Sequence, residues 1–375
     1  MNLRAFRKIL LRVLTTRAAW PILISVGLLC TFSLLALELA SPERADKQRM
    51  WLLLGAGVVL VSLLPHYNLI GRLAYAFYGL TIFLLLAVFL APQVAYTHRW
   101  FVLPGGTLFQ PSELAKISFV LVLAWHLRRA KNINTLEGLL FPFALAIIPF
   151  MLVLAEPDLG TALLFPLVLY AMLLAAGARM RHLLAIAAIA LFAMPGAYPF
   201  LQPYQQKRIK SVLTVVMNKD SETLETLRTG DYHQQYQSQV AHGSGGAFGQ
   251  GPQGVLPFRK GLLPEAYTDF IYSVIGAEWG FAGCVLVLLL YLGFLIASLE
   301  IAATARDNFA KFLVVGLACT ILFQTMMNLN MTLGPPMPVV GVALPFVSYG
   351  GSSLLTSLLA AGLLLNVSVR RSPLS

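Results

Sequence analysis

Apolar runs of about twenty residues recur along this chain and alternate with short polar stretches. A helix needs about 20 apolar residues to cross the hydrocarbon core of a bilayer, so each run predicts a membrane-spanning helix. Proline residues interrupt the fifth and sixth runs, which a membrane tolerates where neighbouring groups satisfy the freed backbone. We expect ten helices, at residues 20 to 38, 50 to 66, 70 to 91, 112 to 128, 138 to 155, 159 to 176, 183 to 200, 269 to 299, 310 to 328 and 350 to 367.

Composition supports the same interpretation. Of the 375 residues, 58% are hydrophobic and 11% are charged, whereas soluble domains have about 25% charged residues. We therefore predict an all-α integral membrane protein that forms one polytopic domain over residues 1 to 375. The first apolar run is too long for a signal peptide, and many more runs follow it. The three cysteines lie in apolar runs without metal-ligand spacing, so we expect them to be packing residues.

The charges divide unequally between the two sides that ten helices would create. The side of the termini carries fifteen of the 27 Lys and Arg residues but only three of the 16 acidic ones. An excess of Lys and Arg marks the cytoplasmic side, so both termini are predicted to be cytoplasmic. The net charge of +11 follows from this orientation, and we expect no nucleic-acid partner.

One connection is much longer than the others. Residues 201 to 268, between the seventh and eighth helices, form a predicted extracytoplasmic loop, with a mobile linker expected at 218 to 231. Loops of this length in a compact fold are usually functional or disordered. This one leads directly to Asp269, a carboxylate at the edge of hydrocarbon. Such a group is costly and is usually retained for chemistry, transport or structural pairing.

Other polar residues collect on the same predicted side. Glu113 and Lys116 are three residues apart at the start of the fourth helix and share a face, either as a structural pair or as contacts for a ligand. Asp158 precedes the sixth helix, where it could cap the helix or contact a ligand or metal. The glycine-rich residues 242 to 251 match neither a P-loop nor a dinucleotide fingerprint, and indicate only a sharp turn or a close backbone approach.

Taken together and in order, these segments resemble the SEDS family, the RodA/FtsW type of bacterial cell-wall glycan polymerase. The resemblance runs from the first span to the last. Its motifs are Arg99-Trp100, residues 109 to 116 (Phe-Gln-Pro-Ser-Glu-Leu-Ala-Lys), 156 to 161 (Glu-Pro-Asp-Leu-Gly-Thr), 204 to 209 (Tyr-Gln-Gln-Lys-Arg-Ile), Gln237-Ser238, 243 to 246 (Gly-Ser-Gly-Gly), 263 to 265 (Leu-Pro-Glu), 268 to 271 (Thr-Asp-Phe-Ile) and 345 to 353. Ala277-Glu278, Asn328-Leu329-Asn330 and Gly334-Pro335-Pro336 depart from the usual pattern.

The resemblance implies a ten-helix fold and a peptidoglycan glycosyltransferase that polymerises lipid II into glycan strands. It implies a multi-pass protein of the bacterial cytoplasmic (inner) membrane, with its active site facing the periplasm and a class B penicillin-binding protein as partner. The elongation branch, RodA-like, is favoured over the division branch, FtsW-like. The motif acid matches Asp269, and the remaining polar positions of the family match Arg99, Glu113, Lys116, Asp158, Arg208, Gln239, Ser244, Glu265 and Ser348.

Our mechanistic hypothesis gives Asp269 the role of general base. It would take the proton of an attacking sugar hydroxyl in a single inverting displacement. The leaving pyrophosphate would meet Arg99, Lys116 and Arg208, and a divalent ion, Mg²⁺ or Mn²⁺, held near acids such as Asp158.

Two alternatives remain open. A flippase or secondary transporter for a lipid-linked precursor would also use intramembrane charges, but near the midplane and on both sides. A scaffold for wall-synthesis partners would leave Asp269 dispensable. The clustering of charges on one side favours the polymerase.

Overall fold

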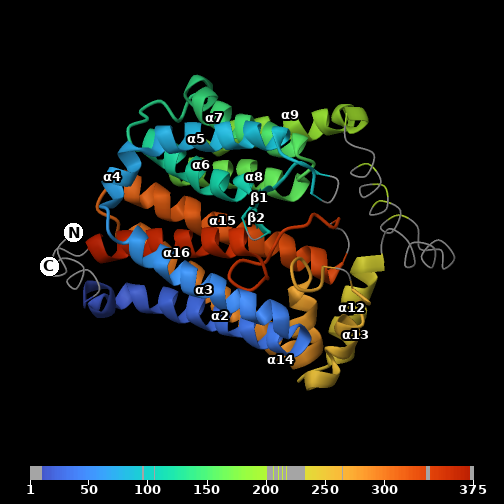
Figure 1. The fold of residues 1–375 in the computed structure, drawn as a ribbon. Coiled ribbons are helices and arrows are strands. Elements are labelled where there is room, and N and C mark those ends of the chain that lie inside the picture. The colour runs from blue at the N-terminus through green and yellow to red at the C-terminus, as the bar shows by residue number, and fades with distance from the viewer. Residues whose placement is uncertain are drawn as a thin grey trace.

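The computed structural model describes most of the chain as a bundle of long helices, with short helices gathered at one end (Figure 1). The residues that it describes are 11 to 94, 97 to 104, 106 to 200, 206, 210, 213, 217, 233 to 263, 265 to 334 and 338 to 371. The expected linker at 218 to 231 lies outside these residues.

The order of the helices and strands along the chain is as follows. After a short 3-10 turn, Arg17–Ala19, the first half contains α2 (Trp20–Ala40), α3 (Pro42–Ser62), α4 (Tyr67–Arg72), α5 (Ala74–Ala87), β1 (Phe101–Leu103), β2 (Thr107–Phe109), α6 (Pro111–Leu127), α7 (Leu136–Ala155), α8 (Leu159–Ala175) and α9 (Met180–Ala197). The second half contains α12 (His233–Gly245), α13 (Leu256–Arg259), α14 (Ile271–Ala303), α15 (Asn308–Leu333) and α16 (Gly351–Arg371).

Each of the ten expected spans overlaps a helix in the described part of the chain, but two boundaries were wrong. The second helix begins at Pro42 rather than near residue 50, because proline at the first position and Glu43 in the first turn suit a helix start. The third expected span is divided at Leu73 into α4 and α5. The hairpin of β1 and β2, which pairs Phe101 with Phe109, was not predicted.

Helix length and composition support a multi-pass membrane protein. Large apolar side chains face outward, such as Leu53 at 77% and Phe192 at 84% exposure, as suits a bundle surrounded by lipid. The number of crossings and the side of the termini stay predictions. The spans long and apolar enough to cross a bilayer are Arg17–Ala40, Leu136–Ala155, Ile271–Ala303, Asn308–Leu333 and Gly351–Arg370, and shorter apolar helices are Ala74–Leu90, Leu159–Ala175 and Met180–Phe192.

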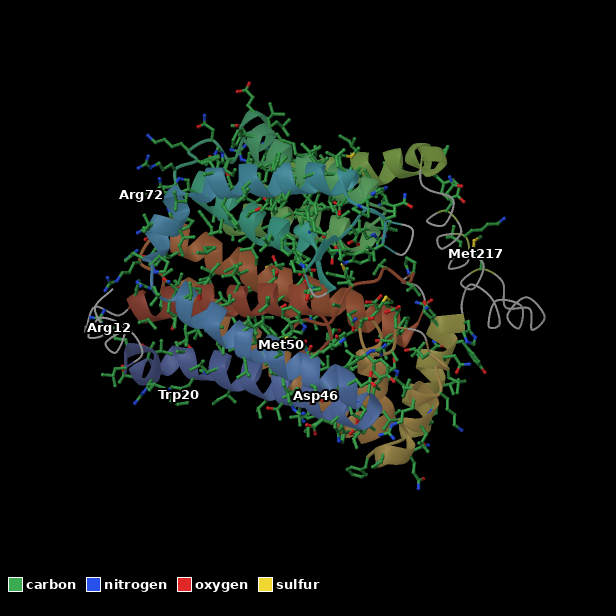
Figure 2. The ribbon with its side chains drawn as sticks, viewed as in Figure 1. Arg12, Trp20, Asp46, Met50, Arg72 and Met217 are labelled. Carbon is green, nitrogen blue, oxygen red and sulfur yellow. The ribbon has the colours of Figure 1, made fainter. Side chains whose placement is uncertain are left out.

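Charged side chains mark the two ends of the bundle. Arg12 and Arg72 lie at one end, and Asp46, near the start of α3, lies toward the other (Figure 2). The helices α12 and α13 lie at the end opposite α4 (Figure 1). The long predicted loop therefore contributes its described helices to a layer across one end of the bundle.

The core of the bundle is built around α6 and α15. Nearly all of α6 is buried, and it packs against α5 and α15. Gly316 lets α15 approach closely, since a Cβ there would come within 2.7 Å of the Met172 sulfur on α8. Phe119 on α6 meets Phe165 on α8 edge-on, with ring centroids 5.5 Å apart.

The glycine-rich segment after α12 lies against a break in α14. Gly280 has a φ of +66°, which interrupts the helical hydrogen bonding. The loop replaces the lost partners: Gln250 N donates to Ala277 O at 2.9 Å, and Phe281 N donates to Gly246 O at 2.9 Å. The predicted close backbone approach is therefore confirmed, and it satisfies backbone groups that the break would leave unpaired.

Gly245 should be sensitive to any side chain. A Cβ at Gly245 would overlap the carbonyl of Gly276 on α14, whereas one at Gly243, on the same helix, would meet nothing within 4 Å. We expect Gly245→Ala to destabilise the protein by about 1–3 kcal/mol, because the backbones must separate. Thermal unfolding in detergent should show this, together with faster amide exchange over residues 233 to 245. Gly243→Ala is the matched control, and equal losses in both would contradict the packing.

Candidate active site

Asp269 follows a tight turn and lies two residues before α14. The backbone N–H groups of Thr268, Asp269 and Phe270 all donate to Glu265 O, at 3.1 to 3.2 Å. Glu265 has a φ of +55°, a left-handed conformation uncommon for a residue with a side chain. Its exposed carboxylate accepts from the Thr268 hydroxyl at 2.9 Å. The turn thus fixes the backbone of Asp269 and leaves its side chain half-buried at the edge of the bundle.

The segment before α16 packs against this turn. The Ser348 hydroxyl donates to Thr268 O and accepts from Leu344 N at 2.7 Å. Tyr349 N donates to Tyr267 O at 2.9 Å. Predicted contacts Ser348, Glu265 and Asp269 are therefore brought together in one cluster, and Ser348 is itself buried. Its hydroxyl is engaged in holding two loops together.

Residues 338 to 344, which we call the hub loop, lie beside the Asp269 carboxylate. Gly341 has a φ of +65°, and a Cβ at this position would come 3.4 Å from Asp269 Oδ2. A Cβ at Gly160, at the start of α8, would overlap Val340 O of the same loop. The hub loop therefore joins the Asp269 turn to the turn between α7 and α8.

Two amides on α15 hold the hub loop in place. Asn328 Nδ2 donates to both Asp269 O and Val342 O, at 2.7 Å each. Gln324, one helical turn earlier, donates from Nε2 to Ala343 O at 2.9 Å. Sequence reasoning gave neither residue this role. The available signal was two amides four residues apart in an apolar helix, which places both on one face.

Gln324 also connects the site to a buried ion pair. Lys116 Nζ donates to Glu113 Oε1 and to Gln324 Oε1, both at 2.9 Å. The exposed fractions of Lys116 and Glu113 are only 4% and 6%. Of the two alternatives that their spacing left open, the structure contains the ion pair. A continuous path therefore runs from this pair through Gln324 to the hub loop and Asp269.

The turn between α7 and α8 holds the next two predicted residues. Arg99 donates from Nε to Glu156 O at 2.8 Å and from Nη2 to Pro157 O. Asp158 caps α8 by accepting from Thr161 N at 3.1 Å, which is one of the two alternatives that the sequence left open. Its other oxygen accepts from Gln110 Nε2 at 3.0 Å.

The surroundings of this turn strongly shift the pKa of the Glu156 carboxyl group. It is fully buried, and neither side-chain oxygen has a hydrogen-bond partner among the described residues. Burial, with a further contribution from the nearby Asp158 and an opposing one from Arg99, raises its pKa to about 9. Glu156 is therefore neutral at neutral pH, and Arg99 binds carbonyl oxygens at the turn rather than this carboxyl group.

The remaining predicted residues lie farther out. Gln239 on α12 donates to Leu333 O at 3.0 Å, and the Ser244 hydroxyl donates to Ala241 O within the same helix at 2.9 Å. Arg208 lies outside the described residues. Among the residues that the structure describes, no group of three His, Cys, Asp or Glu side chains is placed to hold a metal ion. Both Asp158 oxygens already accept from internal donors, which does not fit a preformed metal site there.

Comparisons with known proteins match almost the whole chain. The model of the FtsW/RodA/SpoVE family, described as a cell cycle protein, matches residues 13–373. A probable peptidoglycan glycosyltransferase FtsW of Geobacter sp. strain M18 is 36% identical over 86% of each chain. The peptidoglycan glycosyltransferase MrdB of Helicobacter pylori is 32% identical over 92% of this chain and 88% of its own. A solved chain from a peptidoglycan synthase complex that coordinates polymerization and crosslinking is 29% identical, with a TM-score of 0.79 over 94% of this chain and 98% of its own.

The stability of the protein should fall much more when one member of the buried ion pair is removed than when both are removed. Glu113→Leu leaves the Lys116 charge buried without its counterion and should destabilise the protein by about 3–5 kcal/mol. Glu113→Leu/Lys116→Met removes both charges and should be distinctly more stable than the single variant. Thermal unfolding of the three proteins in one detergent measures this. A double variant as unstable as the single one would contradict an ion pair at this position.

Glu156 should make stability depend on pH. Its folded pKa of about 9 lies above the ordinary 4.5, so the folded state binds the extra proton between these values. Stability should therefore fall as pH rises through this window, by up to about 1.4 kcal/mol per pH unit. Glu156→Gln should flatten the dependence of the unfolding midpoint between pH 5 and 9. Glu43→Gln, at an exposed carboxyl group, should keep the wild-type slope, and an unchanged slope in Glu156→Gln would contradict the assignment.

Proposed function

This chain belongs to the FtsW/RodA/SpoVE family, and on that premise we propose that it is a peptidoglycan glycosyltransferase that polymerises lipid II into glycan strands. The observation that carries the proposal is the placement of Asp269. Its backbone is fixed by the Glu265 turn and Asn328, while its half-buried carboxylate stands beside the glycine of the hub loop. A carboxylate on a fixed backbone at the edge of the bundle is suited to proton transfer.

In the proposed reaction Asp269 acts as general base. A sugar hydroxyl of one substrate loses its proton to the carboxylate as its oxygen attacks the anomeric carbon of the other. The bond from that carbon to the lipid pyrophosphate breaks, and the configuration inverts. A positioned base contributes about 10²–10⁴-fold to such a step. Glycine suits position 341 beside this carboxylate, because the φ of +65° there is strained for a residue with a side chain.

Cationic side chains near the hub loop can stabilise the negative charge of the departing pyrophosphate. Lys116 has three N–H donors and uses two of them on Glu113 and Gln324. Arg99 uses two of its five donors on carbonyl oxygens of the α7–α8 turn. Arg99 therefore holds positive charge beside the site, with donors left for phosphate oxygens. Lys116 is enclosed and paired with Glu113, so it acts on the site through Gln324 and the hub loop. Arg208 is assigned the same role from the family motif alone. The mechanism takes no step through a metal ion, because the described carboxylates do not form a site for one.

The proposed setting follows from the family and its solved relatives. We assign the protein to the bacterial cytoplasmic membrane, with Asp269 facing the periplasm. A penicillin-binding protein of class B is the expected partner, since the similar solved chain belongs to a complex that couples polymerization to crosslinking. Relatives carry the names of both branches, FtsW and MrdB, and the elongation role in cell shape stays our prediction.

The transporter alternative is less well supported by the charge distribution. Lys116, Glu113 and Asp269 are joined through one network near one end of the bundle. A transport path would need essential charges near the midplane and toward the other side as well. A scaffold would give no reason for a carboxylate that lies beside the hub loop on a backbone held by its own turn and by Asn328.

Asp269→Asn should reduce glycan polymerisation by at least about 100-fold, because the amide cannot accept the hydroxyl proton. Purified protein in liposomes with lipid II, a divalent salt and the cognate penicillin-binding protein would be compared on glycan gels. Glu43→Gln, at an exposed carboxyl group outside this cluster, is the control and should retain wild-type activity. Thermal unfolding should show both variants folded.

Two outcomes would overturn this assignment. Near wild-type polymerisation by Asp269→Asn would remove Asp269 from the role of base. Absence of strands under every condition, together with protein-dependent movement of lipid II across the liposome bilayer, would support the transporter instead.

A further inference from the structure

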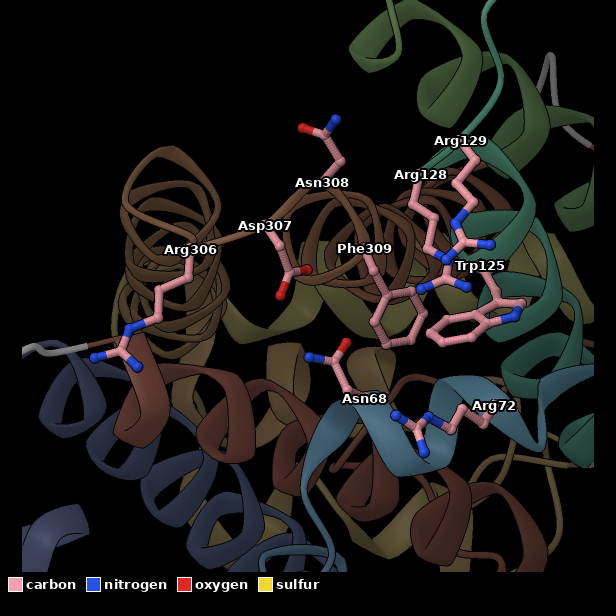
Figure 3. Close-up of a pocket in the computed structure, with 9 residues that line it drawn as sticks. All are labelled: Asn68, Arg72, Trp125, Arg128, Arg129, Arg306, Asp307, Asn308 and Phe309. Atoms are coloured by element: carbon pink, nitrogen blue, oxygen red, sulfur yellow. The ribbon is translucent and has the colours of Figure 1, made fainter.

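A polar pocket of about 600 Å³ lies between α4, the end of α6 and the turn from α14 to α15 (Figure 3). It lies at the opposite end of the bundle from Asp269. The helix α16 runs between them: it begins two residues after Tyr349, and near its far end Arg370 donates to Leu63 O at 2.8 Å. At 1.5 Å per residue, this helix separates the two sites by about 30 Å. The pocket therefore takes no part in the proposed reaction.

Four arginines and one carboxylate line the pocket. The arginines are Arg72, Arg128, Arg129 and Arg306, and the acid is Asp307. Asp307 Oδ1 accepts from Ala310 N and Oδ2 from the Tyr67 hydroxyl, both at 2.8 Å, so its oxygens serve the start of α15 and α4.

Three of these arginines lack a counterion. No carboxylate in the described part of the chain forms an ion pair with Arg72, Arg128 or Arg129. Arg128 Nε is buried and likewise has no hydrogen-bond partner among the described residues. A concave site with this excess of positive charge attracts an anion, and the guanidinium fork matches the oxygens of a phosphate.

The walls of the pocket are fixed by aromatic packing. Arg128 stacks on Trp125, and Trp125 meets Phe309 edge-on with ring centroids 5.1 Å apart. Gly71 allows α4 to lie directly on these rings, since a Cβ there would overlap Trp125 and come within 2.8 Å of Phe309. Figure 3 shows the guanidinium groups of Arg72 and Arg128 on opposite sides of the two rings. The charges are thus presented by a preorganised frame.

We propose that this pocket binds the phosphate headgroup of an anionic phospholipid. The surroundings favour a lipid over a free anion. The exposed apolar side chains Leu69 and Leu73 flank Arg72, with 50% and 58% exposure, and offer a surface for acyl chains. Trp125 lies near the end of α6, as tryptophans do at membrane interfaces. Basic pockets between helix ends on the cytoplasmic side suit lipid phosphates, and this end is the predicted cytoplasmic one.

Native mass spectrometry of the full chain in detergent would test the proposal. The protein would be titrated with dioleoyl phosphatidylglycerol, dioleoyl phosphatidylcholine, glycerol 1-phosphate and inorganic phosphate. We expect phosphatidylglycerol to bind at least about tenfold more tightly than the other three. Arg128→Gln/Arg129→Gln should weaken its binding about thirtyfold, and the exposed single variant Arg72→Gln about fivefold, because each interfacial cation contributes a similar amount.

The matched control is Arg179→Gln/Arg181→Gln, which removes the same charge from the predicted cytoplasmic side outside the pocket. It should leave phosphatidylglycerol affinity unchanged. An equal loss in this control would replace the site with general surface attraction. Binding of inorganic phosphate as tight as that of the lipid would make the pocket a free-anion site, and absence of any preference for phosphatidylglycerol would reject it. Arg72→Gln, whose side chain is exposed, keeps the test valid if loss of the Arg128 stack unfolds the protein.

Discussion

The structure depends on satisfying one ammonium group inside an apolar bundle. Lys116 is almost fully enclosed, and a charge there is tolerated only if its donors find partners within the protein. Glu113 supplies the opposite charge from the same helix, and Gln324 supplies a carbonyl oxygen from a different one. This requirement fixes how α15 is rotated against α6. Once α15 is fixed, the side-chain amides of Gln324 and Asn328 donate to the hub loop and hold it in place.

The candidate site is consequently a product of backbone hydrogen bonds more than of side chains that meet one another. Asn328 donates hydrogen bonds to the backbone carbonyl oxygens of Asp269 and Val342, and the Ser348 hydroxyl donates one to that of Thr268. Glycines at positions 160 and 341 let the segments approach without side chains between them. Arg99 likewise donates to a backbone carbonyl oxygen of the α7–α8 turn, that of Glu156. The outer end of the bundle is therefore assembled from loops that would have no fixed shape alone.

Sequence patterns predicted the helices well because the length of an apolar run and the thickness of a bilayer are both fixed. They also offered the contact of Glu113 with Lys116 and the cap at Asp158 as alternatives, since both involve neighbours on one helix. They did not predict Gln324 or the start of α3. Which residues meet across helices depends on rotation and tilt, and a charged first turn such as that at Glu43 carries no apolar signal. The family motifs selected Arg99 and Gln239 as site residues. They did not indicate the backbone carbonyl oxygens to which these two side chains donate.

The interruption at Gly280 divides α14 into two helical segments. Beyond it, the helix is held by its neighbours in the bundle. Residues 246 to 250, which follow α12 directly, form backbone hydrogen bonds on both sides of the break, with Ala277 before it and with Phe281 and Ala282 after it. The Ser238 hydroxyl of α12 also forms a hydrogen bond with that of Ser273, in the first turn of α14. The first turns of α14 thus belong to the outer layer, and Asp269 immediately precedes them. The helix α12 therefore packs against the segment that directly follows the proposed base, and the outer layer and the Asp269 turn are joined through the first turns of α14.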